Sequence, residues 1–186
     1  MDHKNHTSYL LEYKHCDITV EPTDVIVHQI NAVTLYPAGL ALTLKKKYPY
    51  SDRYGERRML GRNLAIEEDR DIPGTILVRK PTAQSDPIII GIVGQYSPGK
   101  PRSKYETGEM REKWFQEGLE KIKEWIVAYE KKKKPINKIS FPYTIGCGLA
   151  GGNWDQYDRM IQEFTKAVGR HVVICDINNL IQSSRD

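Results

Sequence analysis

The chain has 186 residues, a length that suits one domain with a normal hydrophobic core. Hydrophobic residues make up 39% and charged residues 28%, which is ordinary for a soluble protein. Lys and Arg (28) exceed Asp and Glu (24) by four, an excess that suits an acidic ligand but is small for a protein that binds nucleic acid through a basic face.

The sequence contains no sign of a membrane span, a leader or a disulfide framework. No apolar run approaches the ~20 residues that a membrane span needs, and residues 1–6 are polar, unlike the apolar core of a signal peptide. Cys16, Cys147 and Cys175 are scattered and odd in number, which predicts neither disulfides nor a zinc site. We therefore expect a reducing compartment, the cytoplasm or the nucleus, and no contact with a membrane.

Strands and helices alternate in the first half of the chain. The predicted elements are an edge strand over residues 8–12, a central strand over 25–30, a helix over 38–47, a charged helix over 50–60, a polar loop over 61–74, and strands over 75–79 and 88–93. The unbroken apolar run at 25–30 is typical of a strand buried on both faces. Pro49 separates the two helices, and the turn-rich residues 81–87 predict that the last two strands pair.

The second half of the chain continues the alternation. The predicted elements are a long loop over residues 94–107, a helix over 111–132, a strand over 139–141, a Gly-rich loop over 143–152, a helix from Trp154 to Gly169, and a strand over 172–175. In the first of these helices Phe115, Leu119, Ile122 and Ile126 recur at helical spacing, so one of its faces is expected in the core. The whole pattern predicts an α/β protein with a largely parallel sheet.

Four glycines fall within the seven residues 146–152, between a strand and a helix start with Asn153 as its cap. A strand, a Gly-rich turn and a helix together present bare N–H groups and a positive helix end to an anion. A tight connection without a ligand would need only one or two glycines. Residues 31–39 form a second loop of this kind. Because ligands of parallel sheets bind at the carboxyl ends of the strands, we expect the two loops to clamp a diphosphate.

The order of four motifs resembles the macro domain, the ADP-ribose-binding module. The motifs are Cys16-Asp17-Ile18-Thr19, Ile26-Val27-His28-Gln29-Ile30-Asn31, Ala38-Gly39-Leu40-Ala41 and Ile145-Gly146-Cys147-Gly148-Leu149. The likeness is nearest to the branch of yeast-type ADP-ribose 1″-phosphate phosphatases and terminal ADP-ribose glycohydrolases. It implies one macro domain over residues 1–186 with a core at about 9–176, a three-layer α/β/α fold with a mixed, mostly parallel sheet, and neither a metal nor a cofactor.

The resemblance also implies the ligand-binding residues. Asp17 matches the aspartate that accepts a hydrogen bond from the adenine amino group, Ile18 supports it through its backbone, and Asn31 matches the asparagine at the distal ribose. The loops that would hold the diphosphate contain Pro37, Ala38, Gly39 and Leu40 on one side, and Ile145, Gly146, Cys147, Gly148 and Leu149 on the other. Tyr143 and Thr144, which precede the second loop, are further candidates; Tyr143 either flanks the ligand or packs at the rim.

This sequence departs from the branch at two catalytic positions. The glycohydrolases use a lysine nucleophile and an aspartate, and the resemblance places Gln95 and Ala150 at those positions, which argues against a lysyl mechanism. Gln95 remains a ligand-contact candidate. Pro37 replaces a glycine of the family and removes one N–H donor from the first loop.

Two further residues have a functional and a structural interpretation. His28 matches a histidine of the phosphatase-like branch, but a histidine inside an apolar strand is usually part of the core. Cys147 is either a thiol activated at a helix N-terminus or a small residue that fills a tight loop, and we favour the second interpretation.

The expected function is binding of ADP-ribose or ADP-ribose 1″-phosphate. Bound water would hydrolyse this phosphate or an ADP-ribosyl ester, with Asn31 and His28 as the catalytic candidates. The alternative is a non-catalytic reader, whose partner is free ADP-ribose or an ADP-ribosylated protein. Binding of RNA or poly(ADP-ribose) through residues 131–134 is a third hypothesis. The modest net charge argues against it, as does the position of these lysines at a predicted helix end, where cations complement the helix dipole.

Overall fold

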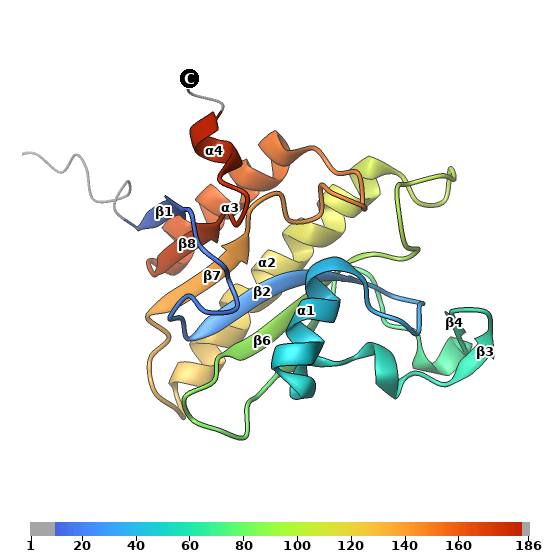
Figure 1. Ribbon diagram of the computed structural model, residues 1–186, viewed down its shortest axis with the longest axis horizontal. Helices are drawn as coiled ribbons and strands as arrows, with labels where there is room; N and C mark the ends of the chain where they lie inside the picture. The colour runs from blue at the N-terminus through green and yellow to red at the C-terminus, as the bar shows by residue number, and fades with distance from the viewer. Residues whose placement is uncertain (1–9, 184–186) are drawn as a thin grey trace, which may run out of the picture.

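The computed structural model describes residues 10–183, which are built around one six-stranded sheet (Figure 1). The strand order is β1-β8-β7-β2-β6-β5, and all neighbouring pairs are parallel except β5 with β6. The strands are β1 (Leu11–Lys14), β2 (Val25–Asn31), β5 (Ile76–Arg79), β6 (Ile88–Gln95), β7 (Lys138–Pro142) and β8 (His171–Cys175). A separate antiparallel hairpin consists of β3 (Met59–Gly61) and β4 (Leu64–Ala65).

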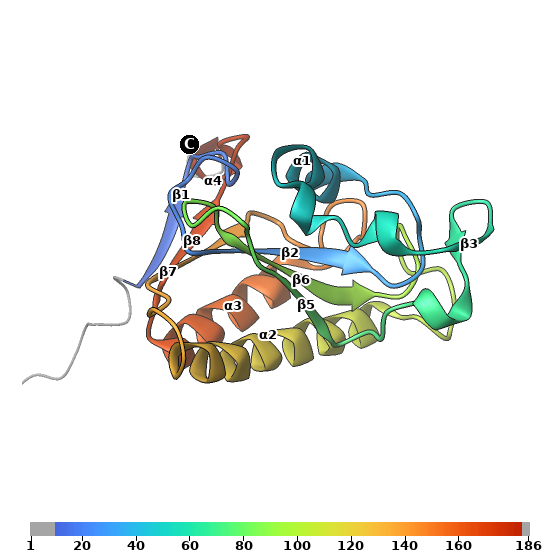
Figure 2. The same cartoon turned by 90° about the horizontal axis from the view of Figure 1, so that it is seen from below.

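Helices cover both faces of the sheet, as the edge-on view in Figure 2 shows. Helices α2 (Gly108–Glu130) and α3 (Trp154–Val168) lie on one face, and α1 (Gly39–Lys47) lies on the other. A short helix, α4 (Leu180–Ser183), follows the last strand. No helix within residues 10–183 is long and apolar enough to cross a bilayer. The predicted three-layer α/β fold with a mixed, mostly parallel sheet is therefore confirmed.

The central strand β2 shows why this arrangement follows from the sequence. Val25 and Val27 belong to the core cluster on the side of α2 and α3, whereas Ile26 and Ile30 belong to the two clusters on the other face. All four side chains are buried. Because both faces are covered, the strand is apolar at successive positions and does not alternate with polar residues.

Most predicted elements are found close to their expected positions, with strands at each of the predicted sites. The first strand begins at Leu11, and residues 8 and 9 of its predicted range lie outside the described residues. The predicted N-terminal tail and residues 184–186 also lie outside them. Asn153 caps α3 through its side chain, and Gly169 ends the helix in the left-handed conformation with φ +61°. The second helix of the first half is the main error.

Residues 50–60 do not form a helix. They contain two 3₁₀ turns, Pro49–Ser51 and Tyr54–Glu56, and then enter strand β3. The prediction is wrong because long-range ion pairs hold this segment: Arg53 and Arg57 both bind Asp71. The hairpin β3-β4 spans the end of the predicted helix and the start of the region predicted as loop, so residues 61–74 are more ordered than expected.

Candidate functional site

A cleft runs along the carboxyl ends of the parallel strands and consists of three adjoining hollows of about 280, 190 and 310 Å³. We call them the first, middle and third hollows. Leu40, Tyr143 and Thr144 line both the first and the middle hollow, and Gln29, Ala38 and Gly146 line both the middle and the third. The shared residues make one continuous groove of the three hollows.

The residues predicted to bind ligand are distributed along this groove. Asp17, Ile18, Leu40, Tyr143 and Thr144 line the first hollow. His28, Ala38, Leu40, Tyr143, Thr144, Ile145 and Gly146 line the middle hollow. Asn31, Ala38, Gly39, Leu40, Gln95, Gly146, Gly148 and Leu149 line the third. Of the predicted residues, Pro37 and Cys147 do not line any of the three.

The first hollow has a carboxylate at its edge and apolar walls. Asp17 accepts a hydrogen bond from the N–H of Thr19 at 2.8 Å through Oδ1, and its other oxygen has no partner in the described part of the chain. Leu40, Tyr143 and Cys175 supply apolar surface. The Tyr143 ring packs edge-on against Trp154, with ring centroids 5.0 Å apart, so this tyrosine is both a wall of the hollow and part of the rim packing.

One wall of the middle and third hollows is the N-terminus of α1. Ala38 is its N-cap and provides no side-chain hydrogen bond, and the first turn contains no acidic residue. The first N–H groups of a helix have no acceptor within the helix, so those of Gly39, Leu40 and Ala41 stay open to the cleft. The positive end of the helix dipole lies at the same point, which makes this wall suited to an anion.

The facing wall is the Gly-rich loop after β7. Within this loop the N–H of Ile145 donates to Pro142 and that of Cys147 donates to Thr144, but the N–H groups of Gly146 and Gly148 donate no hydrogen bond inside residues 10–183. Thr144 and Gly146 both adopt positive φ, +57° and +71°. Alternation of left-handed residues with ordinary ones turns successive N–H groups to the same side, an arrangement that binds anions.

The helix that follows the Gly-rich loop does not take part, contrary to our expectation. The side chain of Asn153 already caps α3 by accepting a hydrogen bond from the N–H of Asp155, and Asp155 adds a negative charge to the first turn. Residues 152–155 line none of the three hollows. The positive helix end at this cleft is therefore that of α1.

The third hollow is lined by side-chain amides. Asn31 is only 8% exposed, and its Oδ1 accepts hydrogen bonds from the N–H of Val33 (3.1 Å), the N–H of Thr34 (2.8 Å) and the Thr34 hydroxyl (3.0 Å). This oxygen is thus committed to the shape of the first loop, and the amide nitrogen is the part of Asn31 left for a ligand. Gln95 lies at the end of the neighbouring strand β6.

Residues that the sequence did not suggest hold the first loop in place. The buried Arg57 donates to the carbonyl oxygens of Asn31 (2.7 Å) and Thr34, and pairs with Asp71 at 2.6 Å. Asn63, at the turn of the hairpin β3-β4, accepts hydrogen bonds from the N–H groups of two further loop residues, Leu35 and Tyr36. No local signal in the sequence predicted this support, since Arg57 was predicted to lie in a helix over residues 50–60 and Asn63 in a loop over residues 61–74.

A second buried ion pair holds the other side of the third hollow. Arg111 is 2% exposed and pairs with Glu106 at 2.8 Å. Its guanidinium also donates to the carbonyl oxygens of Ser97 (3.1 Å), Gly99 and Ala150 (2.9 Å). It therefore connects the loop after β6 to the Gly-rich loop, and it fixes the distance between them.

The two titratable groups considered for chemistry are both shifted by burial. His28 is buried beneath the middle hollow, and burial lowers the pKa of its imidazole to about 4, so the ring is neutral at neutral pH. Its Nδ1 has no hydrogen-bond partner among the described residues. Burial raises the pKa of the Cys147 thiol to about 12, and the side chain packs against the main core. This supports the interpretation of Cys147 as a small loop-filling residue.

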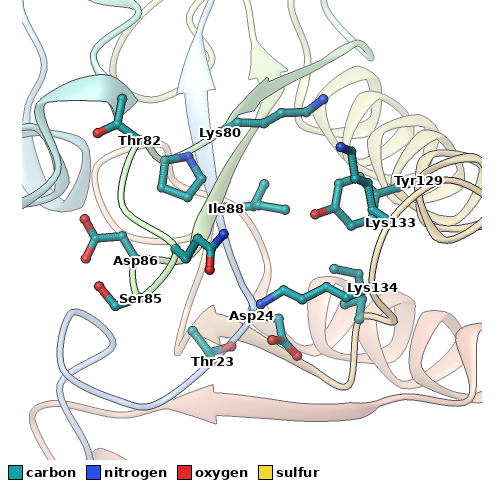
Figure 3. Close-up of a pocket in the computed structure, with 13 residues that line it drawn as sticks. Thr23, Asp24, Lys80, Thr82, Ser85, Asp86, Ile88, Tyr129, Lys133 and Lys134 are labelled. Carbon is teal, nitrogen blue, oxygen red and sulfur yellow. The ribbon is translucent and has the colours of Figure 1, made fainter.

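A cavity larger than any of these three hollows lies elsewhere, near the amino ends of β2 and β6, and is shown in Figure 3. We call it the lysine pocket: it measures about 520 Å³, and Lys80, Lys133 and Lys134 line it together with Tyr129. None of these three lysines forms an ion pair with a described residue. Lys133 and Lys134 follow the C-terminus of α2, the negative end of its dipole, where cations stabilise the helix without any ligand.

Comparison with solved structures shows that the chain has the macrodomain fold. It is similar to the macrodomain of Mycobacterium tuberculosis DarG (TM-score 0.67, 17% identity, 89% of this chain and 96% of that one), and to that of Thermus aquaticus DarG (0.63, 23%, 89% and 97%). It is also similar to a Trypanosoma brucei macrodomain in complex with ADP-ribose (0.64, 11%, 98% and 70%). Neither protein-family models nor curated protein sequences give a match.

Proposed function

We propose that this protein binds ADP-ribose, or a derivative that contains it, along the cleft. The observation that carries the proposal is the order of chemical groups in one continuous groove. A carboxylate with apolar walls comes first, two sets of open main-chain N–H groups come next, and side-chain amides come last. ADP-ribose has the matching order of adenine, diphosphate and distal ribose.

Each part of the groove fits one part of the ligand by elementary chemistry. The free carboxylate oxygen of Asp17 accepts a hydrogen bond from the adenine amino group, and the apolar walls cover the flat base. The N–H groups of Gly39, Gly146 and Gly148 bind the diphosphate without adding mobile charged side chains. The amide nitrogen of Asn31 donates to a hydroxyl of the distal ribose. The Trypanosoma brucei neighbour, which contains ADP-ribose, supports this choice of ligand.

We further propose that the protein hydrolyses ADP-ribose 1″-phosphate or an ADP-ribosyl ester, as the resemblance to the yeast-type phosphatase branch implies. Water cleaves the bond between the distal ribose and the phosphate or acyl group, and the products are ADP-ribose and inorganic phosphate or a carboxylic acid. Gln95 and Ala150 occupy the positions of the lysine and aspartate of the glycohydrolases, so neither an amine nucleophile nor its partner acid is present there. His28 is the candidate base, because its buried imidazole stays neutral and its Nδ1 is unoccupied.

The alternative function is a non-catalytic reader of free or protein-linked ADP-ribose. Two observations favour it. The residues that line the third hollow include no carboxylate, imidazole or amine, and His28 lies beneath the middle hollow, away from the position proposed for the distal ribose. A reader needs the same groove but no group that transfers a proton.

Calorimetric titration with ADP-ribose, followed by a phosphate-release assay on ADP-ribose 1″-phosphate, tests both functions. Micromolar binding with turnover that His28→Leu abolishes would establish the hydrolase. Binding without turnover would establish the reader for this substrate and direct the assay to ADP-ribosyl esters. Absence of binding to ADP-ribose would refute the proposal.

A further inference from the structure

Two glutamine side chains and a backbone carbonyl form a chain of hydrogen bonds at the third hollow. The Nε2 of Gln29 donates to the Oε1 of Gln95 at 2.9 Å, and the Nε2 of Gln95 donates to the carbonyl oxygen of Ser97 at 2.9 Å. Gln29 lies on β2 and Gln95 on β6, so the chain crosses between neighbouring strands at their carboxyl ends.

The backbone carbonyl fixes the orientation of both amides. A carbonyl oxygen only accepts hydrogen bonds, so Gln95 has to turn its NH₂ group toward Ser97. Its oxygen then faces Gln29, so Gln29 has to donate a hydrogen bond to it through its own NH₂ group. The Oε1 of Gln29 is therefore directed away from the pair, and the usual ambiguity between the two ends of an amide is removed.

This Oε1 is buried and has no hydrogen-bond partner among the described residues. Glycines stand on two sides of it, Gly94 and Gly146; a Cβ on Gly146 would lie 2.7 Å from it. Any side chain at either position would therefore collide with the amide. Gln29 also lines both the middle and the third hollow, so its amide lies at their junction.

A buried acceptor without a donor destabilises the empty protein, because it has lost its bonds to water. Phosphate oxygens cannot relieve this, since they also only accept. Among the groups that the cleft would hold at this junction, the donors are O–H groups: a hydroxyl of the distal ribose, or a water bound beside it.

We propose that the Oε1 of Gln29 accepts a hydrogen bond from an O–H group at the junction of the diphosphate and the distal ribose. If that group is a ribose hydroxyl, Gln29 selects ligands that have the distal ribose over ADP; if it is the water beside it, Gln29 positions that water. This inference rests on the proposed function. It assigns a contact to Gln29, the neighbour of His28 in the sequence, and it makes Gln95 a positioning residue that holds Gln29 in the accepting orientation.

The test combines a variant of the protein with variants of the ligand. Gln29→Met and Gln29→Leu replace the amide by apolar groups of similar size, and thermal unfolding identifies which of them folds. Affinities are measured by calorimetry for ADP-ribose, for ADP, and for ADP-ribose analogues that lack the 2″- or the 3″-hydroxyl. ADP serves as the matched control because it occupies the first and middle hollows alone.

If the donor is a ribose hydroxyl, the folded variant loses about tenfold in affinity for ADP-ribose and keeps its affinity for ADP. Removing that hydroxyl from the ligand then weakens binding to the wild type but not to the variant, because the two changes delete the same bond. If the donor is the attacking water, both affinities stay unchanged, and kcat for phosphate release falls while KM does not.

The proposal is overturned if wild type and variant bind ADP-ribose and all its analogues equally and also turn over equally or not at all. Wild-type protein that binds neither ADP-ribose nor ADP would instead refute the proposed function itself. The two failures are thus distinguishable by the wild-type titrations alone.

Discussion

The two ends of the parallel sheet have cavities of opposite design. At the carboxyl ends, the cleft presents main-chain N–H groups and the positive end of α1, held by buried ion pairs. At the amino ends, the lysine pocket is larger and presents flexible ammonium groups beside the negative end of α2. Cavity size alone would select the lysine pocket, whereas the arrangement of donors favours the cleft for the proposed diphosphate.

The difference lies in how far each set of donors is fixed before a ligand arrives. The N–H groups of the cleft are held by the fold, so little conformational freedom is lost when an anion binds. A lysine ammonium is strongly hydrated and sits on a flexible stem, and its rotamers would have to be frozen. The comparison therefore predicts large effects for changes at the cleft and small ones at the lysine pocket.

The largest expected effect is on the pH dependence of stability, because the imidazole of His28 is buried beneath the cleft. The unfolded chain protonates His28 at its ordinary pKa of about 6.5, but burial lowers the folded value to about 4. As the pH falls from 6.5 to 4, the unfolded state gains a proton that the folded state does not. The free energy of unfolding should decrease in this window, by about 3 kcal/mol in total.

Urea unfolding of wild type and His28→Leu at several pH values between 4 and 7 measures this term. Other groups contribute equally to both proteins, so the difference between the two curves isolates His28. Parallel curves would mean that the imidazole is solvated in the folded state.

A negative charge in the Gly-rich loop should remove ADP-ribose binding. A Cβ at Gly148 meets no atom within 4 Å, and its φ is not in the left-handed region. Gly148→Glu should therefore fold and place a carboxylate against the diphosphate, with a loss of at least about 100-fold in affinity by calorimetry. Gly148→Ala is the matched control and should bind nearly as the wild type does. Equal affinity of the Glu variant would show that the phosphates lie elsewhere.

Removal of the carboxylate at the first hollow should have a smaller effect. We expect Asp17→Ala to weaken ADP-ribose binding about tenfold, because one hydrogen bond to the base is lost while the phosphate contacts remain. Asp17→Asn is the informative comparison, since it keeps the turn but replaces one acceptor by a donor. An unchanged affinity in Asp17→Ala, with thermal unfolding intact, would contradict the adenine assignment.

Neutralising the lysine pocket should have almost no effect on the same titration. The double variant Lys80→Gln/Lys133→Gln changes two of its cations, and we expect its ADP-ribose affinity to stay within about twofold of the wild type, because exposed charges this far away are screened by salt. A loss of affinity comparable to that of Gly148→Glu would show that the ligand binds in the lysine pocket and not in the cleft.

Local patterns predicted the elements and the edge of the sheet at which the site lies. The apolar run at β2 and the helical spacing of Phe115, Leu119 and Ile122 predicted the right elements, because burial of these apolar side chains is enough to decide the local structure. Because parallel strands share one carboxyl edge, the order of the motifs was enough to bring Asp17, Asn31 and the Gly-rich loop together. The error at residues 50–60 has the converse cause, since partners distant in the sequence decide the conformation of that segment.

The sequence by itself determined the α/β alternation and the two small-residue loops, because residue type and spacing carry that information. Only the tertiary structure decided which helix end faces the cleft, that Arg57 and Arg111 hold its two walls, and that Gln29 presents a buried acceptor at its centre. These depend on hydrogen bonds between segments far apart in the chain, and the direction of a hydrogen bond exists only once both partners are in place.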